Sequence, residues 1–298
     1  MGHSPVIDSV ASLFEIVSTT RNFWNALALI FMARTFQDQK MMSITFRDGS
    51  TFRLNYQQYR AARHALASGC VLRRTGSLFL IEKGILKLMG PLELMGYAGE
   101  PFEKMYECEY KNKTVLDVGG YIGETAVLFL KWGAKRVILY EPVQPHHQFI
   151  KMNIALNGFE SQIELHEEGI SDHDGYETIR YDSLNTSFGR RNEGANEMTI
   201  RVRDVSSVIQ ESHAQIAKFD CEGAEASLIQ VPNSILRLVD SFLIEVHSGE
   251  VRRLLLTKFN DAGFACVREL GVPNASVILF RQRVGSGLSV RNGEEQEV

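Results

Sequence analysis

The spacing of apolar and polar residues divides the chain into two regions with different rhythms. Over residues 6–36, apolar side chains recur near helical spacing, which predicts one long helix that packs through an apolar face. This stretch lacks the Lys-rich polar face of a membrane-surface helix. The pattern therefore favours a packing helix, and a contact between subunits is the alternative.

Short strands are expected after this helix. The segment "MMSITFRDGSTFRLNY" alternates apolar and polar residues on both sides of Asp48-Gly49, a dipeptide that is typical of a hairpin turn. A short helix over residues 59–68 and a second strand pair across Thr75-Gly76 follow. These elements predict an α+β extension over residues 1–112 that makes contacts to substrate or to another subunit.

From residue 113 onward, strand-like and helix-like segments alternate. Such a rhythm requires crossover connections and predicts an α/β domain, residues 113–284, in which helices cover both faces of a mostly parallel sheet. The last two strand-like segments, "FACVREL" and "ASVILFRQR", are separated by only four residues, so they must pair antiparallel. Residues 285–298 are rich in Gly, Ser and Glu and are expected to form a flexible tail.

Composition and charge exclude several classes of protein. The 298 residues are 44% hydrophobic and 23% charged, with a formal net charge of −4, as in an ordinary globular protein. The first 112 residues carry 13 Lys or Arg against 10 Asp or Glu, so no basic tail is present to attract nucleic acid. The longest apolar run, residues 26–33, is too short to span a bilayer.

The cysteines indicate a reducing compartment. Cys70, Cys108, Cys221 and Cys266 lie far apart and form no C-x-x-C pair, which argues against a zinc site and a redox motif. The N-terminus also lacks the basic segment and cleavage site of a signal peptide. A cytoplasmic location is therefore expected.

One stretch carries most of the chemical information. "TVLDVGGYIGETAVLFLKWGAKRVILYEP", residues 114–142, predicts a strand, a glycine turn, a helix and a second strand that ends in Glu141. This order places backbone N–H groups and the positive end of a helix dipole at the carboxyl edge of a sheet, where α/β proteins bind ligands. Glu141 would lie beside the same crevice and could accept the hydroxyls of a ribose. The predicted ligand therefore contains a ribose.

Two cofactors with a ribose fit this arrangement, NAD and S-adenosylmethionine (SAM), and a purely structural turn is the remaining alternative. A G-x-G-x-x-G fingerprint that starts at Gly119 would need glycines where Tyr121 and Glu124 stand. Asp117 and Glu124 would also repel a pyrophosphate, whereas they suit the ammonium and the sulfonium of SAM. The residues favour SAM.

The same segments resemble a known family. "DVGGYIG", "YEP", "KMNIALNG", "ISDHDG", "KFDCEGAEASLI" and "FLIEVH" are similar to motifs of the FkbM-like family of SAM-dependent methyltransferases, over about residues 113–280. The resemblance implies the seven-stranded, Rossmann-like class I methyltransferase sheet with an antiparallel last hairpin. It also implies O-methylation of a hydroxyl on a sugar, glycolipid or other hydroxylated metabolite.

The sequence departs from the family pattern at three points. Gly120 and Tyr121 replace the usual Ala-Asn of the turn, so contacts of the cofactor with Tyr121 would be altered. Val205-Ser206 stands where the family often has Leu-Asp ahead of its fourth strand. No N-P-P-Y motif occurs, which disfavours methylation of amide or base nitrogens.

The candidate cofactor site follows from the strand ends and from the resemblance. Asp117 is expected to organise the turn and to hold the SAM ammonium, while Glu141 binds the ribose. After the third strand, Glu167 or Glu168 could accept from the adenine amino group, and Glu168 is preferred. The predicted cofactor-binding residues are Asp117, Gly119, Gly120, Tyr121, Gly123, Glu141, Pro142 and Glu168.

The candidate catalytic residues are two pairs at the ends of later strands. Asp220 and Glu222 bracket Cys221, and Glu245 and His247 bracket Val246, so each pair points to one side of its strand. His247 or Asp220 is the candidate base, with Glu222 and Glu245 orienting the acceptor or the base. A divalent cation held by these groups is conceivable in chemical terms but is not favoured.

Two further expectations concern the acceptor. The polar stretch over residues 182–198 has the length of a lid or substrate loop, and its Arg190 and Arg191 could meet an anionic or sugar acceptor. The favoured partner is a small molecule or carbohydrate, with no nucleic acid, and a homo-oligomer could form through the N-terminal helix. The rival functions are an RNA or other methyltransferase on the same fold, and a SAM- or nucleotide-binding module without catalysis.

Overall fold

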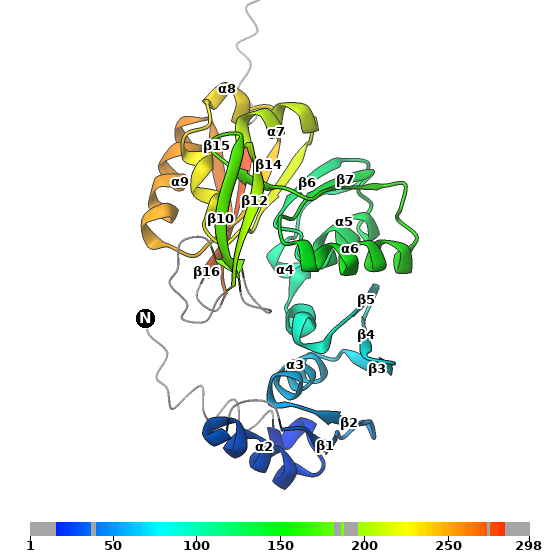
Figure 1. Ribbon diagram of the computed structural model, residues 1–298. Coiled ribbons are helices and arrows are strands. Elements are labelled where there is room, and N and C mark those ends of the chain that lie inside the picture. Colours follow the sequence, from blue (N-terminus) through cyan, green and yellow to red (C-terminus); the bar gives the residue numbers. More distant parts are fainter. Residues whose placement is uncertain (1–15, 37–39, 182–185, 188–195, 273–274, 284–298) are drawn as a thin grey trace, which may run out of the picture.

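A seven-stranded sheet forms the centre of the main domain in the computed structural model (Figure 1), which describes residues 16–36, 40–181, 186–187, 196–272 and 275–283. The strand order is β15-β16-β14-β13-β6-β7-β8. All neighbours are parallel except β16, which runs antiparallel to both β14 and β15. The predicted mostly parallel sheet with an antiparallel last hairpin is therefore confirmed. The strands are β6 (Thr114–Val118), β7 (Arg136–Tyr140), β8 (Ile163–His166), β13 (Ile216–Phe219), β14 (Ser241–Val246), β15 (Phe264–Val272) and β16 (Ala275–Gln282).

Helices cover both faces of this sheet because successive side chains on each strand point to opposite faces. On β6, Val115 packs into one core with α5 and α6, and its neighbour Leu116 packs into another with α7, α8 and α9. On β14, Leu243 and Phe242 divide in the same way. The helices are α5 (Glu124–Lys131), α6 (Gln144–Asn157), α7 (Val205–Ser212), the 3-10 helix η2 (Ala224–Ile229), α8 (Asn233–Leu236) and α9 (Gly249–Asp261).

A second, four-stranded sheet stands beside the main one, and the sequence pattern did not predict it. Its order is β11-β10-β12-β9, and Ile179, Ile200 and Val202 pack with Val143 beneath it. The stretch 162–171 is divided between β8 and β9, which belong to different sheets. The strands are β9 (Gly169–Ser171), β10 (Gly175–Tyr181), β11 (Thr186–Ser187) and β12 (Asn196–Asp204).

The polar stretch over residues 182–198 is partly strand. β11 and the start of β12 lie within it, so the expectation of a continuous loop is wrong at these positions. Arg190 and Arg191, the candidate acceptor contacts, lie outside the described residues.

The N-terminal extension is built from a hairpin, a helix and a three-stranded sheet. Both predicted hairpins are present, as β1 paired with β2 and β3 paired with β4, and β5 adds a third strand to the latter. The elements are α2 (Phe23–Phe36), β1 (Met42–Thr45), β2 (Thr51–Leu54), α3 (Tyr56–Ala67), β3 (Val71–Thr75), β4 (Leu78–Lys83), β5 (Leu86–Gly90), the 3-10 helix η1 (Leu92–Gly99) and α4 (Phe102–Met105).

The predicted helix over residues 6–36 is not continuous. Residues 16–19 are helical, but Thr20 then forms a β-bridge with Phe46, and α2 begins only at Phe23. Between them, Arg21 N donates to Thr45 O, and the Asn22 Oδ1 accepts from Thr45 N at 2.8 Å. The chain pairs with the edge of the first hairpin here, which the helical spacing of apolar residues could not reveal. Residues 1–15 lie outside the described residues.

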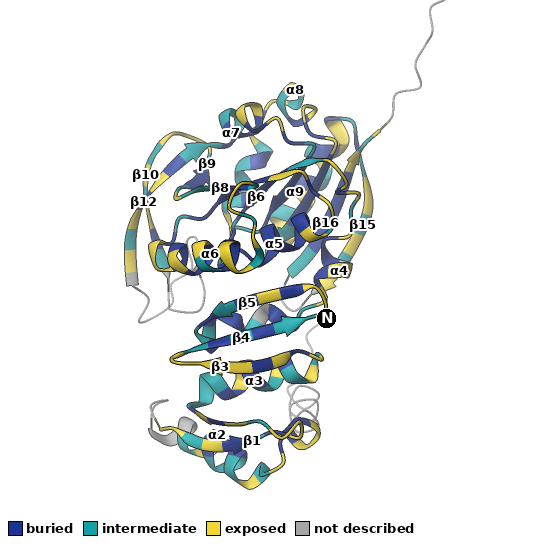
Figure 2. Ribbon diagram, turned by 90° about the vertical axis from the view of Figure 1, so that its right-hand side faces the viewer, coloured by how far each residue is buried: buried dark blue, intermediate teal, exposed yellow. Residues whose placement is uncertain are grey.

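The extension is joined to the main domain by side chains of α6. β5 lies directly against α6 in Figure 2. Asn153 is fully buried, and it accepts from Met89 N of β5 at 2.7 Å and donates to Ile122 O of the glycine turn at 2.9 Å. One helical turn later, the Asn157 amide donates to Lys87 O at 2.9 Å. Two asparagines thus supply hydrogen bonds to β5 that a further strand would otherwise supply.

A second junction holds the short helix α4. The Arg268 guanidinium, on β15, donates to the backbone oxygens of Lys104, Met105 and Glu107. The last carbonyls of a helix have no partner within the helix, so an arginine is a natural donor to them. This clamp holds the segment that leads from the extension into β6 against the end of the sheet.

No described helix has the length and apolar character needed to cross a membrane.

We expect Asn153→Ala to lower the free energy of unfolding by about 2–4 kcal/mol, because it leaves one buried and one part-buried backbone group without this partner. Chemical denaturation of the full chain measures the change. Asn157→Ala is the matched control and should cost less, since its side chain is only half-buried. Equal losses of unfolding free energy in the two variants would contradict the expectation that the hydrogen bonds of the buried Asn153 contribute more than that of Asn157.

Candidate active site

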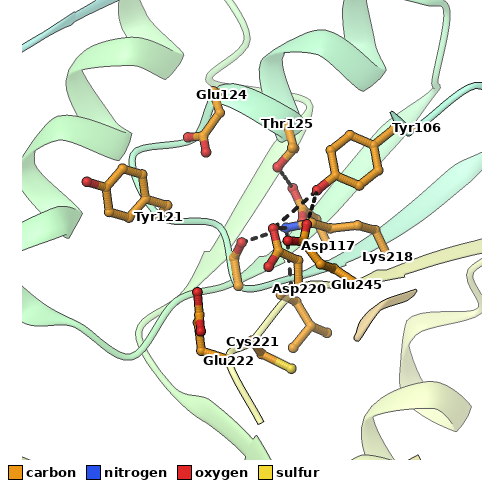
Figure 3. A network of polar contacts seen from close by, with 12 residues as sticks. Tyr106, Asp117, Tyr121, Glu124, Thr125, Lys218, Asp220, Cys221, Glu222 and Glu245 are labelled. Atoms are coloured by element: carbon orange, nitrogen blue, oxygen red, sulfur yellow. Dashed lines mark hydrogen bonds and ion pairs between the residues drawn. The ribbon is translucent and has the colours of Figure 1, made fainter. Parts of the chain in front are cut away.

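An open pocket lies at the carboxyl ends of β6, β7, β13 and β14, and its empty volume, mouth included, is about 960 Å³. The glycine turn and the start of α5 form one wall, and Glu100, Phe102 and Tyr106 from the extension form another. Figure 3 shows how Tyr106, Asp220 and Glu245 meet beside Lys218 and Asp117. The lining residues are Glu100, Phe102, Tyr106, Val118, Gly119, Tyr121, Glu124, Thr125, Tyr140, Glu141, Pro142, Glu168, Gly169, Ile170, Asp220, Cys221, Glu222, Ala224 and Glu245.

The glycine turn brings the end of β6 against the end of β13. Gly119 has a φ of +84°, and a Cβ there would lie 1.8 Å from the Asp220 carbonyl oxygen, so only glycine fits. At Gly120 a Cβ would lie 2.2 Å from Leu139 Cδ1, so any larger residue would require the leucine side chain to shift. Gly123, with a φ of +89°, begins α5.

Tyr121 has a backbone conformation that is unusual for its residue type. Its φ is +46°, a left-handed conformation that asparagine adopts more readily than tyrosine. Two contacts accompany it: Tyr121 N donates to Glu141 Oε2 at 2.8 Å, and the ring packs edge-on against His146. Tyr121 therefore contributes an aromatic side chain to the pocket wall.

Glu141 follows β7 and is held firmly at the pocket. Only 4% of the residue is exposed, and its carboxylate accepts from Tyr121 N, from Val143 N at 3.0 Å and lies 3.2 Å from His146 Nδ1. Three of the roughly four acceptor positions of a carboxylate are thus used, which leaves room for one donor from a ligand.

The two candidate acids after β8 point in different directions. Glu168 lines the pocket and pairs with Arg201 of β12 at 3.0 Å. Glu167 lies outside the pocket, half-exposed, where its carboxylate pairs with Lys151 at 2.7 Å. Of these two acids, Glu168 is the one that lies in the pocket with other predicted cofactor-binding residues.

Asp117 lies behind the pocket wall, not in its lining. It is fully buried, accepts from Thr125 Oγ1 at 2.6 Å, and its Oδ1 lies 3.1 Å from Lys218 Nζ without the alignment of a hydrogen bond. Lys218 is buried as well, and its ammonium donates to Gly119 O at 2.7 Å. Burial lowers the pKa of Lys218, but Asp117 and Asp220 outweigh it and raise that pKa above its usual value, so the lysine carries its charge.

Three of the predicted catalytic carboxylates gather at the ends of β13 and β14. The Tyr106 hydroxyl lies 3.2 Å from Asp220 Oδ2 and 3.4 Å from Glu245 Oε2. Glu222 lines the same pocket, and burial raises the pKa of its carboxyl. Burial, followed by the charge of Asp220, also raises the pKa of Glu245.

His247 lies behind these acids and does not line the pocket. Its ring nitrogens lie 3.5 Å from Glu245, 3.7 Å from Glu222 and 4.0 Å from Glu225. Glu225 and Glu245 raise the pKa of His247 to about 10. An imidazolium has no free lone pair to accept a proton, so of the two candidate bases the geometry favours Asp220.

The lining is strongly acidic. It contains seven carboxylates and, among the described residues, no lysine, arginine or histidine: Glu100, Glu124, Glu141, Glu168, Asp220, Glu222 and Glu245. Burial raises the pKa of Glu100 and of Glu124 to about 8 in each case. Within the described part of the chain, no group of three or more His, Cys, Asp or Glu side chains is arranged to hold a metal ion.

Sequence reasoning assigned no role to Glu100, Tyr106 or Lys218. Glu100 and Tyr106 belong to the extension and carry no motif that could single them out. Lys218 stood in the quoted "KFDCEG" segment without a role, and a lysine within a strand gave no sign that it would be buried and paired.

The strand order, the antiparallel last hairpin and the pocket at the glycine turn define a Rossmann-like methyltransferase fold. The sequence profile described as "Methyltransferase FkbM domain" matches residues 117–265, half of the chain. The chain therefore belongs to the FkbM methyltransferase family.

Solved structures of similar fold are distant. Methyltransferase FkbM from Methylobacillus flagellatus KT is 16% identical, with 87% of this chain and 59% of that chain covered and a TM-score of 0.44. A ribosomal protein methylase from Lactobacillus delbrueckii subsp. bulgaricus is 13% identical, with 65% and 81% covered and a TM-score of 0.38. No curated protein matches the chain. Likeness at this level carries no argument about the acceptor.

The raised pKa of Glu124 makes stability depend on pH. Between pH 4.5, the ordinary value, and about 8, the folded state keeps a proton that the unfolded state releases, so stability falls as pH rises, by at most about 1.4 kcal/mol per pH unit. Glu124→Gln should lose less stability than the wild type between pH 5 and 8, as measured by denaturation at each pH. Glu160→Gln, at an exposed position, is the control. Parallel curves for all three proteins would show that Glu124 ionises normally.

Proposed function

We propose that the protein is a SAM-dependent methyltransferase that methylates a hydroxyl oxygen of a sugar, glycolipid or other hydroxylated metabolite. The observation that carries this proposal is the acidic pocket at the glycine turn of a methyltransferase-family sheet. A pocket lined by carboxylates favours a cationic ligand and opposes a phosphate, so SAM fits it and a dinucleotide does not.

The residues around the turn suit the parts of SAM. Glu141 has one acceptor position left and faces the pocket, where it would bind a ribose hydroxyl. Glu168, beside Gly169 and Ile170, would accept from the adenine amino group. Asp117, through Lys218 and the Gly119 carbonyl, would shape the turn from behind. Glu124 keeps its proton up to a pKa of about 8, and an ammonium bound beside it in the pocket would favour its ionised form.

For this reaction the protein must align the acceptor hydroxyl with the methyl group of SAM and remove one proton from that hydroxyl. Bound SAM supplies a methyl group on a sulfonium, which is already a good leaving group. A hydroxyl loses its proton as the new C–O bond forms, so a proton acceptor must lie beside it. Asp220 lines the pocket and is partly exposed, while Lys218 lies 3.7 Å behind it and stabilises its charge. Glu222 and Glu245 would orient the acceptor hydroxyl.

We expect the pocket wall opposite the glycine turn, which the extension forms, to contact the methyl acceptor. This wall consists of Glu100, Phe102 and Tyr106, which belong to residues 1–112. The proposal therefore divides the chain into an extension that contacts the substrate, a catalytic domain over residues 113–284, and a tail. The tail, from residue 285 on, lies outside the described residues. Formation of a homo-oligomer through α2, where Trp24 is 72% exposed, stays a prediction. A cytoplasmic location also stays a prediction.

Calorimetric titration with SAM, S-adenosylhomocysteine and NAD, each with and without Mg²⁺, tests the cofactor assignment. We expect both adenosyl ligands to bind and NAD not to bind. Glu141→Ala should weaken SAM binding by about 1–3 kcal/mol, the scale of a lost charge-assisted hydrogen bond. Glu167→Ala, which removes a neighbouring acid outside the pocket, is the control. Binding of NAD alone would sink the proposal, and unchanged affinity in Glu141→Ala would remove the ribose contact.

Transfer of labelled methyl from SAM to a panel of sugars, glycolipids and small polyols tests the reaction. With an acceptor from the panel, Asp220→Asn should lower the rate about 10²–10⁴-fold, the usual contribution of a general base, while SAM affinity changes little. Transfer to RNA instead of the panel would favour the rival methyltransferase. SAM binding without transfer to any acceptor would favour a non-catalytic binding module.

A further inference from the structure

We propose that Tyr106, a residue of the N-terminal extension, is a positioning residue that holds Asp220 and Glu245 together as one carboxylate pair at the acceptor end of the pocket. The inference rests on the proposed function for its catalytic meaning, but the pair itself can be tested without any substrate.

The Tyr106 hydroxyl lies between two carboxylates on neighbouring strands. Asp220 follows β13, Glu245 lies on β14, and their nearer oxygens are 3.2 Å and 3.4 Å from the same hydroxyl (Figure 3). Two ionised carboxylates this close to one another would repel. A hydroxyl placed between them offers a donor to either oxygen and keeps the two groups at a fixed spacing.

A different cation lies beside each of the two acids. Lys218 lies 3.7 Å from Asp220 Oδ2, whereas Glu245 meets His247 through its other oxygen at 3.5 Å. Lys218 thus approaches the same Asp220 oxygen that faces the hydroxyl, whereas His247 approaches the Glu245 oxygen that the hydroxyl does not contact. The buried ammonium also lies 5.9 Å from the centroid of the Tyr106 ring, a cation–π contact that fixes the ring over the end of β13.

Tyr106 itself has little freedom. It is 1% exposed and stacks on Phe102, with Phe129 packed edge-on against it. Tyr110 donates its hydroxyl to the Tyr106 carbonyl, and Arg268 holds the preceding carbonyl of Met105. A side chain locked in this way can set the position of the groups that it contacts, as a functional site requires.

The consequence is that the acceptor site spans both regions of the chain. The main domain supplies the two acids and their cations, and the extension supplies the hydroxyl that links them. The sequence profile of the family begins at Asp117, so it covers the acids and leaves the linking residue out.

The titration of Glu245 tests the pair without an acceptor. The full chain carrying ¹³C-carboxyl glutamate is followed by NMR in the wild type, Tyr106→Phe and Tyr110→Phe, with Glu245→Gln to assign the signal. The groups that face Glu245 are Asp220, Glu222, Glu100, Lys218, His247 and Tyr106. Loss of a donor to the ionised form should move the Glu245 midpoint upward by roughly half a pH unit in Tyr106→Phe.

Tyr110→Phe is the matched control, because it removes a buried hydroxyl of the same segment that touches no carboxylate. Because it frees only the Tyr106 carbonyl and leaves the Tyr106 hydroxyl present, it should move the midpoint less than Tyr106→Phe does. Replacement of Tyr106 by 3-fluorotyrosine keeps the shape and makes the hydroxyl a stronger donor, so it should move the midpoint downward even if Tyr106→Phe does not fold. An unchanged midpoint with 3-fluorotyrosine, or equal shifts in Tyr106→Phe and Tyr110→Phe, would overturn the proposal.

A kinetic readout separates positioning from binding. With an acceptor found by methyl transfer, Tyr106→Phe should lower kcat about tenfold and leave the SAM Kd and the acceptor KM within about threefold. A rise in KM at constant kcat would assign Tyr106 to acceptor binding instead. If the wild type binds no SAM, the proposed function fails, whereas the Glu245 titration still decides whether the pair exists.

Discussion

The charge of one buried ammonium, that of Lys218, holds the ends of two strands in the arrangement that the pocket needs. Its nitrogen donates to the Gly119 carbonyl and lies within ion-pair distance of Asp117 and Asp220. Without this cation, a fully buried Asp117 would lose its charge partner, and breaking a buried pair in this way is strongly destabilising. The same cation therefore stabilises the glycine turn on one side and the candidate base on the other.

The pocket combines two electrostatic environments that lie a few ångströms apart. Its surface carries seven acidic residues and, among the described residues, no lysine, arginine or histidine. Behind that surface, Lys218 and the protonated His247 supply positive charge that a ligand does not contact directly. This layering lets several acids gather in one place, because the repulsion among them is offset from behind.

The sheet, its last hairpin and the acids at the strand ends could be predicted because each is local in the sequence. Alternating strands and helices determine the topology, and Asp220, Glu222 and Glu245 follow strands that meet at one edge. The raised pKa of His247 could not be predicted, since it depends on Glu225 and Glu222, which follow a different strand, as well as on Glu245 of its own strand. The roles of Glu100 and Tyr106 were hidden for the same reason: only the packing of the extension brings them to the pocket.

The asparagine junction between α6 and β5 has a consequence for how this chain can be altered. Asn153 hydrogen-bonds to the extension and to the glycine turn at once, so the two regions cannot be exchanged as independent modules. A chain cut at the start of β6 would retain every motif of the family and yet expose a helix face evolved to meet a strand. Any different extension on the same catalytic domain would need its own edge strand in the same register, or a changed α6.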